Sequence, residues 1–182
     1  MTVVQILSLE AVGVSKPVKL YIIRHGEAQP PQGLRGDAIR PLSTYGEQEV
    51  MASGHWLANY LAEQNADALD WLIVSPYIRA RQTASLLRRQ VKVQNEQVND
   101  AITPDGQAEQ VSDWLFAELQ HRGSKVKHVA IVSHMPFVSY LVAALDKTIE
   151  PMLFPTAGIA ELVLDAEQWR GKFIRMAVAE PD

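Results

Sequence analysis

The stretch Tyr21-Ile22-Ile23-Arg24-His25-Gly26-Glu27 places a histidine directly after a run of aromatic and β-branched residues. A second stretch, Val129-Ala130-Ile131-Val132-Ser133-His134-Met135-Pro136, repeats this pattern far along the chain. Such runs predict buried strands, and open α/β sheets bind their ligands at the carboxyl ends of the strands. The two histidines are therefore expected to meet at one sheet edge. Because one of them follows an arginine, the pattern indicates a pocket for a phosphoryl group.

The rest of the chain alternates predicted strands with predicted helices. Thr44 and Glu47 form a capping-box pattern at one helix start, and Ser75 before Pro76 is typical of an N-cap. Alternation of this kind predicts an α/β fold, a three-layer α/β/α sandwich with a mostly parallel sheet. Strands are predicted over residues 18–23, 71–74, 91–98, 128–132, 159–164 and 172–178. Helices are predicted over residues 45–64, 76–89, 107–120 and 138–145, with polar loops over 29–41 and 99–106.

Length and composition exclude several classes of protein. The 182 residues fit one domain, expected over 18–182, preceded by a flexible N-terminal extension over 1–17. The net charge of −4 disfavours a nucleic-acid binder, and the absence of cysteine excludes disulfides and a thiol nucleophile. No apolar run approaches the roughly 20 residues that span a bilayer, and no secretory signal is recognised. A cytoplasmic location is expected.

A third predicted strand end adds a second arginine. Ser75-Pro76-Tyr77-Ile78-Arg79 leads from a strand into a helix, whose N-terminus favours an anion. Arg79 lies in the first turn and can offer its fork of donors to phosphoryl oxygens, whereas Arg81 points away round the helix. Gly26 would let the backbone pass close to a bound oxyanion. The candidate site therefore contains Arg24, His25, Arg79 and His134.

Three motifs in this order resemble the histidine phosphatase superfamily, also called the phosphoglycerate mutase-like fold. They are Arg24-His25-Gly26, Ser75-Pro76-x-x-Arg79-Ala80-x-Gln82-Thr83 and Ser133-His134. The small size, with Arg40-Pro41-Leu42-Ser43-x-x-Gly46 and Ile102-Thr103-Pro104-x-Gly106, is similar to the SixA branch of bacterial phosphohistidine phosphatases. The resemblance covers about residues 19–164.

This resemblance implies that His25 is a nucleophile that forms a covalent phosphohistidine, which water then hydrolyses. Arg24, Arg79 and His134 would hold the phosphoryl oxygens, and neither a metal nor another cofactor is implied. Histidine acts as a covalent catalyst when it is neutral, and its ordinary pKa near 6.5 allows this around neutrality. Arg40 has two open interpretations: contact with phosphate, or a tie within its Pro/Gly-rich loop.

A general acid is harder to assign. Asp100 and Asp105 in the polar loop are candidates, as is Glu27 beside the nucleophile, but none lies in a clear acid motif. An alkoxide needs a proton to leave, whereas a protonated imidazole leaves phosphorus readily, so this gap favours a phosphoramidate substrate. The short separation of His25 from Ser75 leaves no room for a cap domain, which predicts an open, shallow site suited to a protein.

The leading hypothesis is therefore a metal-independent phosphatase that removes phosphate from a histidine phosphotransfer domain of a two-component phosphorelay. A monomer is expected. The alternative is a small-molecule phosphomonoesterase of the same superfamily; a mutase is disfavoured because the chain is too short for a lid. A third hypothesis from another class is an inactive adaptor that binds phosphorylated partners.

Overall fold

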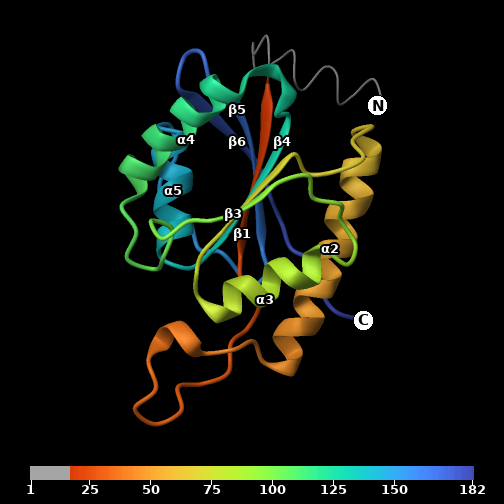
Figure 1. Ribbon diagram of the computed structural model, residues 1–182, viewed down its shortest axis with the longest axis vertical. Helices are drawn as coiled ribbons and strands as arrows, with labels where there is room; N and C mark the ends of the chain where they lie inside the picture. Colours follow the sequence, from red (N-terminus) through yellow and green to blue (C-terminus); the bar gives the residue numbers. More distant parts are fainter. Residues whose placement is uncertain (1–16) are drawn as a thin grey trace.

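A computed structural model describes residues 17–182, and its described strands form one six-stranded sheet (Figure 1). The strand order is β3-β2-β4-β1-β5-β6. The strands are β1 (Val18–Arg24), β2 (Trp71–Val74), β3 (Glu96–Val98), β4 (His128–Ser133), β5 (Ile159–Asp165) and β6 (Arg170–Ala177). The helices are α2 (Thr44–Glu63), α3 (Ile78–Leu87), α4 (Ala108–Arg122) and α5 (Phe137–Leu145), with short 3₁₀ turns η1 (Asp37–Ile39) and η2 (Gly123–Lys125).

The sheet is mostly parallel, as the sequence predicts. Strands β3, β2, β4 and β1 pair in parallel, β5 is antiparallel to β1, and β6 is antiparallel to β5. The register pairs Arg24 with Ser133 and Val74 with Val132. The carboxyl ends of β1, β4 and β2 therefore lie side by side, and the residues that follow these strands meet at one edge of the sheet.

Helices cover both faces of the sheet, which confirms the predicted three layers. Figure 1 shows α4 and α5 on one side and α2 on the other. One core cluster packs Leu115, Phe116 and Leu141 of α4 and α5 against the sheet, and a second packs Leu57 of α2 and Leu87 of α3 against its opposite face. The strands are continuous apolar runs because both of their faces are buried by helices.

Several predicted boundaries differ from the observed ones. The predicted strand over 91–98 is only three residues long, since Val93 makes an isolated bridge to Leu69 rather than extending β3. Helix α2 is capped by Ser43, whose hydroxyl accepts the Gly46 N–H at 3.0 Å. The capping prediction for Thr44 is wrong because that residue already lies in the helix and the extended backbone belongs to Ser43.

The predicted extension over residues 1–17 lies, apart from Pro17, outside the described residues. Between the end of β1 and Ser75, the described chain contains η1, α2 and β2 with their connecting loops. The segment before α2, orange in Figure 1, extends beyond the carboxyl end of β1. Across residues 17–182, no helix combines the length and apolar character required to cross a membrane.

Candidate active site

His25 is the first residue after β1, and its backbone is fixed on two sides. Its N–H donates to the Ser133 carbonyl at 3.0 Å, and its carbonyl accepts from the Ala157 N–H at 3.0 Å. The imidazole Nδ1 lies 2.6 Å from the Gly26 carbonyl oxygen, which can only accept, so Nδ1 carries the proton. Nε2 therefore holds the lone pair, and it accepts a hydrogen bond from Nε of Arg79 at 3.1 Å.

The environment of His25 keeps its imidazole neutral. The pKa of His25 is lowered to about 4: burial is the largest cause, the hydrogen bond to the Gly26 carbonyl opposes it, and the charges of Arg79 and Arg24 act with it. The residue is 7% exposed and thus buried. A neutral imidazole with a directed lone pair is the state that a nucleophilic histidine requires.

Packing requires a glycine at position 26, and the predicted close approach of its backbone to an oxyanion stays a prediction. A Cβ at Gly26 would lie 2.4 Å from the Gly46 carbonyl oxygen, and one at Gly46 would lie 2.0 Å from the Glu27 carbonyl oxygen. The loop after His25 thus packs directly on the first turn of α2. Thr83 of α3 secures it from the other side, since its hydroxyl accepts the Gly26 N–H at 3.3 Å and donates to the Arg79 carbonyl at 2.8 Å.

Arg79 extends from the first turn of α3 and is only 4% exposed. Besides its bond to His25, Nη1 donates to the Asp37 carbonyl oxygen at 2.7 Å and Nη2 donates to Asp37 Oδ2 at 2.9 Å. Its guanidinium lies 5.1 Å from the centre of the Tyr77 ring. Arg81 is exposed, as the helical spacing predicts.

His134 follows β4 and is completely buried. Its ring centre is 5.1 Å from that of His25, and its Nε2 lies 2.6 Å from Ser75 Oγ. Ser75 Oγ also accepts the Tyr77 N–H at 3.4 Å, and when its own proton is donated to Nε2 the ring proton of His134 lies on Nδ1. That buried Nδ1 has no hydrogen-bond partner among residues 17–182.

The pKa of His134 is lowered to about 3, mainly by burial, with His25 and Arg79 acting in the same direction. The second imidazole is therefore neutral as well.

Ser75 contacts His134, which the sequence did not predict. The prediction of Ser75 as an N-cap is wrong, because Tyr77 occupies the N-cap of α3. The available signal was its place directly after β2, equivalent to that of His25 after β1.

Arg24 ends β1 and anchors one arm of its guanidinium. Nη1 donates to the Phe154 carbonyl oxygen at 2.6 Å, while the buried Nε has no hydrogen-bond partner among the described residues. Four buried side-chain atoms lack a hydrogen-bond partner among the described residues, and two of them, Arg24 Nε and His134 Nδ1, lie together at this edge of the sheet, as expected of a ligand site. The structure thus brings all four predicted side chains to one sheet edge.

The predicted acids are not among the groups gathered there. Asp100 and Asp105 are exposed in the loop between β3 and α4, and the hollow they line contains none of the four site residues. Glu27 accepts a hydrogen bond from Ser43 Oγ at 2.7 Å. The carboxylate that accepts a hydrogen bond from Arg79 is that of Asp37, from the loop over 29–41, which carries no periodic sequence signal.

Arg40 ties its loop together. Its Nε donates to the Gln29 carbonyl oxygen at 2.9 Å, and its Nη1 donates to Asp37 Oδ1 at 2.9 Å. Of the two interpretations left open by the sequence, the contacts support the tie within the loop. Contact with phosphate stays a prediction.

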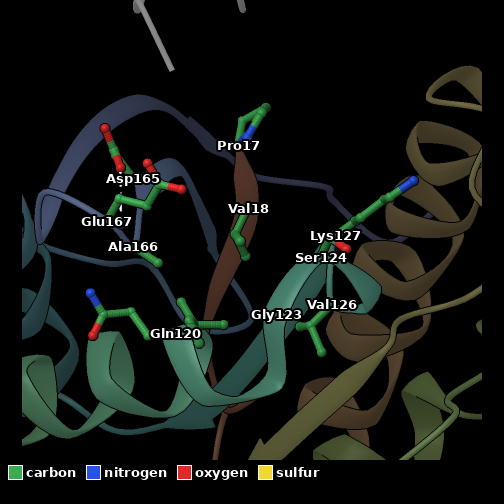
Figure 2. Close-up of a pocket in the computed structure, with 11 residues that line it drawn as sticks. Pro17, Val18, Gln120, Gly123, Ser124, Val126, Lys127, Asp165, Ala166 and Glu167 are labelled. Atoms are coloured by element: carbon green, nitrogen blue, oxygen red, sulfur yellow. Dashed lines mark hydrogen bonds between the residues drawn. The ribbon is translucent and has the colours of Figure 1, made fainter. Parts of the chain in front are cut away.

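A separate hollow of about 600 Å³ lies at the opposite end of the sheet (Figure 2). Val18 at the start of β1, Lys127 before β4 and Asp165 at the end of β5 line it. None of the four site residues does. The two ends of the sheet therefore present different surfaces, and the four predicted site residues lie at the end where β1 and β4 finish.

Comparison with known proteins agrees with this geometry. Residues 20–102 match the model of the histidine phosphatase superfamily (branch 1). The phosphohistidine phosphatase SixA homolog of Haemophilus influenzae is 35% identical over 154 residues, covering 83% of this chain and 91% of that protein. The chain belongs to the SixA branch of the histidine phosphatase superfamily.

Further SixA proteins extend the comparison. Phosphohistidine phosphatase SixA of Escherichia coli is 34% identical over 157 residues, which cover 86% of this chain and 91% of that one. A solved structure of the protein histidine phosphatase SixA complexed with tungstate superimposes with a TM-score of 0.78 at 31% identity, covering 88% and 97% of the two chains. The chain is therefore a phosphatase, as predicted, with the phosphoglycerate mutase-like fold.

Proposed function

We propose that this SixA-branch phosphatase removes phosphate from a phosphorylated histidine on a histidine phosphotransfer domain, with His25 as the covalent nucleophile. The observation that carries the proposal is the neutral imidazole of His25, whose Nε2 lone pair faces the phosphoryl-binding arginine Arg79 at 3.1 Å. Its relatives in Haemophilus influenzae and Escherichia coli are named phosphohistidine phosphatases, which supports the choice of substrate.

The first step transfers the phosphoryl group to the enzyme. Nε2 of His25 attacks phosphorus in line, a new P–N bond forms, and the P–N bond of the substrate breaks. The electron pair of that bond returns to the leaving imidazole, which departs neutral when its other nitrogen already carries a proton. No acid has to protonate the leaving group, in keeping with the exposed positions of Asp100 and Asp105.

Three side chains stabilise the transferred group. The free N–H groups of Arg24 and His134 and the guanidinium of Arg79 would bind the equatorial oxygens, where charge accumulates in the transition state. When a phosphoryl group enters, Nε of Arg79 can move its hydrogen bond from Nε2 of His25 to an oxygen. That exchange releases the lone pair at the moment it is needed.

The second step returns the enzyme to its starting state. Water attacks phosphorus from the side opposite His25, the P–Nε2 bond breaks, and its electron pair returns to Nε2. The water loses its proton to solvent or to the departing phosphate. The net reaction consumes one water and one phosphohistidine and yields histidine and inorganic phosphate.

Residues 17–182 contain no cluster of three or more His, Asp or Glu side chains suited to a metal ion.

The decisive experiment measures phosphate release from a phosphorylated histidine phosphotransfer domain in the presence of a chelator. Turnover is expected for the wild type and should be lost in His25→Ala and His25→Asn. His55→Asn is the matched control, since His55 is an exposed histidine on α2. Alkaline trapping during turnover should place the phosphate on His25. An enzyme that spares this domain would contradict the proposal.

The alternative functions give different results in the same assay series. A small-molecule phosphomonoesterase would cleave phosphate esters faster than the phosphorylated domain, and Asp100→Asn or Asp105→Asn would sharply reduce ester cleavage. An adaptor would bind the phosphorylated domain without releasing phosphate or labelling His25.

A further inference from the structure

Asp37 is the carboxylate that contacts the site, although neither its loop nor its sequence context marked it. Its carbonyl oxygen and Oδ2 accept hydrogen bonds from both terminal nitrogens of Arg79, at 2.7 and 2.9 Å. Its second carboxylate oxygen, Oδ1, accepts from Arg40 at 2.9 Å. The carboxylate is half exposed, whereas the Arg79 side chain that it holds is 5% exposed.

These contacts fix which way the Arg79 guanidinium faces. Because the group is planar, two bonds on its Nη side leave Nε directed toward Nε2 of His25, where the 3.1 Å bond is found. Each Nη has a second N–H, so Asp37 occupies one donor on each nitrogen and leaves others for a phosphoryl oxygen. A bridging carboxylate thus orients the arginine without using all of its donors.

The charges also favour this arrangement. Arg79 and Arg24 bring positive charge to His25, Asp37 hydrogen-bonds to Arg79, and the charge of the buried Glu49 acts on Arg24. A guanidinium as buried as that of Arg79 also needs a counter-ion when no phosphoryl group is bound, because an unpaired buried charge is costly.

We propose that Asp37 is a positioning residue that holds Arg79 against His25 and couples the loop over residues 29–41 to the phosphoryl site. This inference rests on the proposed function of Arg79 as an oxyanion donor. Asp37 itself does not act as a general acid: burial would raise its pKa, but the hydrogen bonds from Arg79 and Arg40 outweigh that effect and hold the pKa below its ordinary value. It therefore stays ionised while it holds the arginine.

The test compares Asp37→Ala and Asp37→Asn with Asp113→Asn, an exposed aspartate on α4. Displacement of a catalytic group by about 1 Å can cost about 100-fold in rate, so Asp37→Ala is expected to lower kcat about 10- to 100-fold with a smaller change in KM. Asp37→Asn should fall in between. Asp113→Asn should match the wild type.

A nitrogen NMR spectrum provides a readout that does not depend on the substrate. In the free wild type the Arg79 Nε–H should exchange slowly and be coupled to His25 Nε2, and in Asp37→Ala it should exchange rapidly. Using an aryl phosphate as a chemical probe keeps the kinetic test valid even if the histidine phosphotransfer domain proves to be the wrong substrate. If Asp37→Ala left both kcat and the Arg79 resonance unchanged, the inference would be overturned. It would also be overturned if this variant kept its kcat and was inhibited more tightly by inorganic phosphate.

Discussion

Strand β1 carries a basic residue near each end, and the two side chains differ in whether their donors have hydrogen-bond partners. At the amino end, Lys19 Nζ donates to Tyr60 Oη at 2.9 Å and to Glu161 Oε1 at 3.2 Å. At the carboxyl end, Nη1 of Arg24 donates to the Phe154 carbonyl oxygen, and its buried Nε has no partner among the described residues. Paired charge indicates structure, whereas free buried donors indicate a place for an anionic ligand.

The same contrast extends to the neighbouring strands. Glu161 on β5 accepts hydrogen bonds from Lys19 and Tyr60 at Oε1 and forms an ion pair with Arg175 at 3.6 Å. Its Oε2 has no hydrogen-bond partner among the described residues, but each charge of this network faces a charge of opposite sign. Beside Arg24, the equivalent neighbour is His134, whose Nδ1 is buried without a partner in residues 17–182. If this contrast is right, substitutions at the carboxyl end should change catalysis, and those at the amino end should change stability alone.

The largest effect within this comparison is expected for Arg24→Gln, which keeps the bulk of the side chain and removes its charge. Loss of one preorganised oxyanion donor costs about 100- to 1,000-fold in kcat, so a decrease of that size is expected. Folding should be little changed, since the anchoring bond to the Phe154 carbonyl can be replaced by the glutamine amide. Steady-state kinetics and thermal unfolding measured together would check it; normal kcat would remove Arg24 from the site.

A smaller effect is expected for Ser75→Ala. In the proposed mechanism the hydroxyl donates to Nε2 of His134 and so keeps the proton on Nδ1, and without the hydroxyl the ring can rotate or place its proton on Nε2. Roughly a tenfold loss of kcat is expected, below the roughly 100-fold or more of a group that itself transfers a proton, because Ser75 acts only through His134. Ser75→Thr, which retains the hydroxyl, is the matched control and should recover part of the activity. If alanine and threonine variants were equally active, the tautomer argument would fail.

A still smaller change is expected in the protonation state of His25 when the pH is lowered from 8 to 5. An ordinary histidine loses most of its neutral form below pH 6.5, but burial and the adjacent arginines lower the pKa of His25 to about 4. The ring nitrogen resonances of His25 should therefore stay those of the neutral Nδ1–H form down to pH 5 and change only near pH 4. A midpoint above pH 6 would show that the imidazole is not buried among cations.

The same shift has a consequence for stability. In the unfolded chain His25 and His134 take up protons near pH 6.5, while in the folded protein their pKa values are about 4 and 3. Between pH 6.5 and the lower folded-state pKa values, the unfolded chain binds more protons than the folded protein. The stability that comes from keeping the two histidines neutral is therefore complete above about pH 6.5 and is lost as the pH falls. Each group changes the free energy of unfolding by up to about 1.4 kcal/mol per pH unit in that window.

The sequence could predict much of this carboxyl edge because strong local patterns mark it. Buried β-branched runs followed by His25 and His134 locate two strand ends, and parallel pairing then requires them to meet. Arg79 follows from the strand-to-helix transition after β2. These are properties of short stretches, and the order of strands in an α/β sheet turns them into a shared site.

What the sequence could not predict depends on contacts between distant segments. Asp37 lies in a Pro/Gly-rich loop, and its bonds to Arg79 span 42 positions. Ser75 was interpreted as a local cap because serine before proline usually is one, yet its hydroxyl is taken by His134 across the sheet. Lys19 gave no signal of its network, since a lysine in an apolar strand finds its partner, Glu161, only when β5 pairs with β1.

The amino end supplies the last and smallest expected effect on catalysis. Lys19→Met should leave kcat and KM within about twofold, because no site residue touches this network. It should nevertheless lower the free energy of unfolding by about 3–5 kcal/mol, since Glu161 would remain buried without its lysine. The double variant Lys19→Met with Glu161→Leu should recover much of that loss by removing the stranded charge. Denaturant unfolding and kinetics on the same samples would separate the two ends of β1: a stable but inactive Lys19→Met enzyme would mean that the amino-end network reaches the catalytic edge after all.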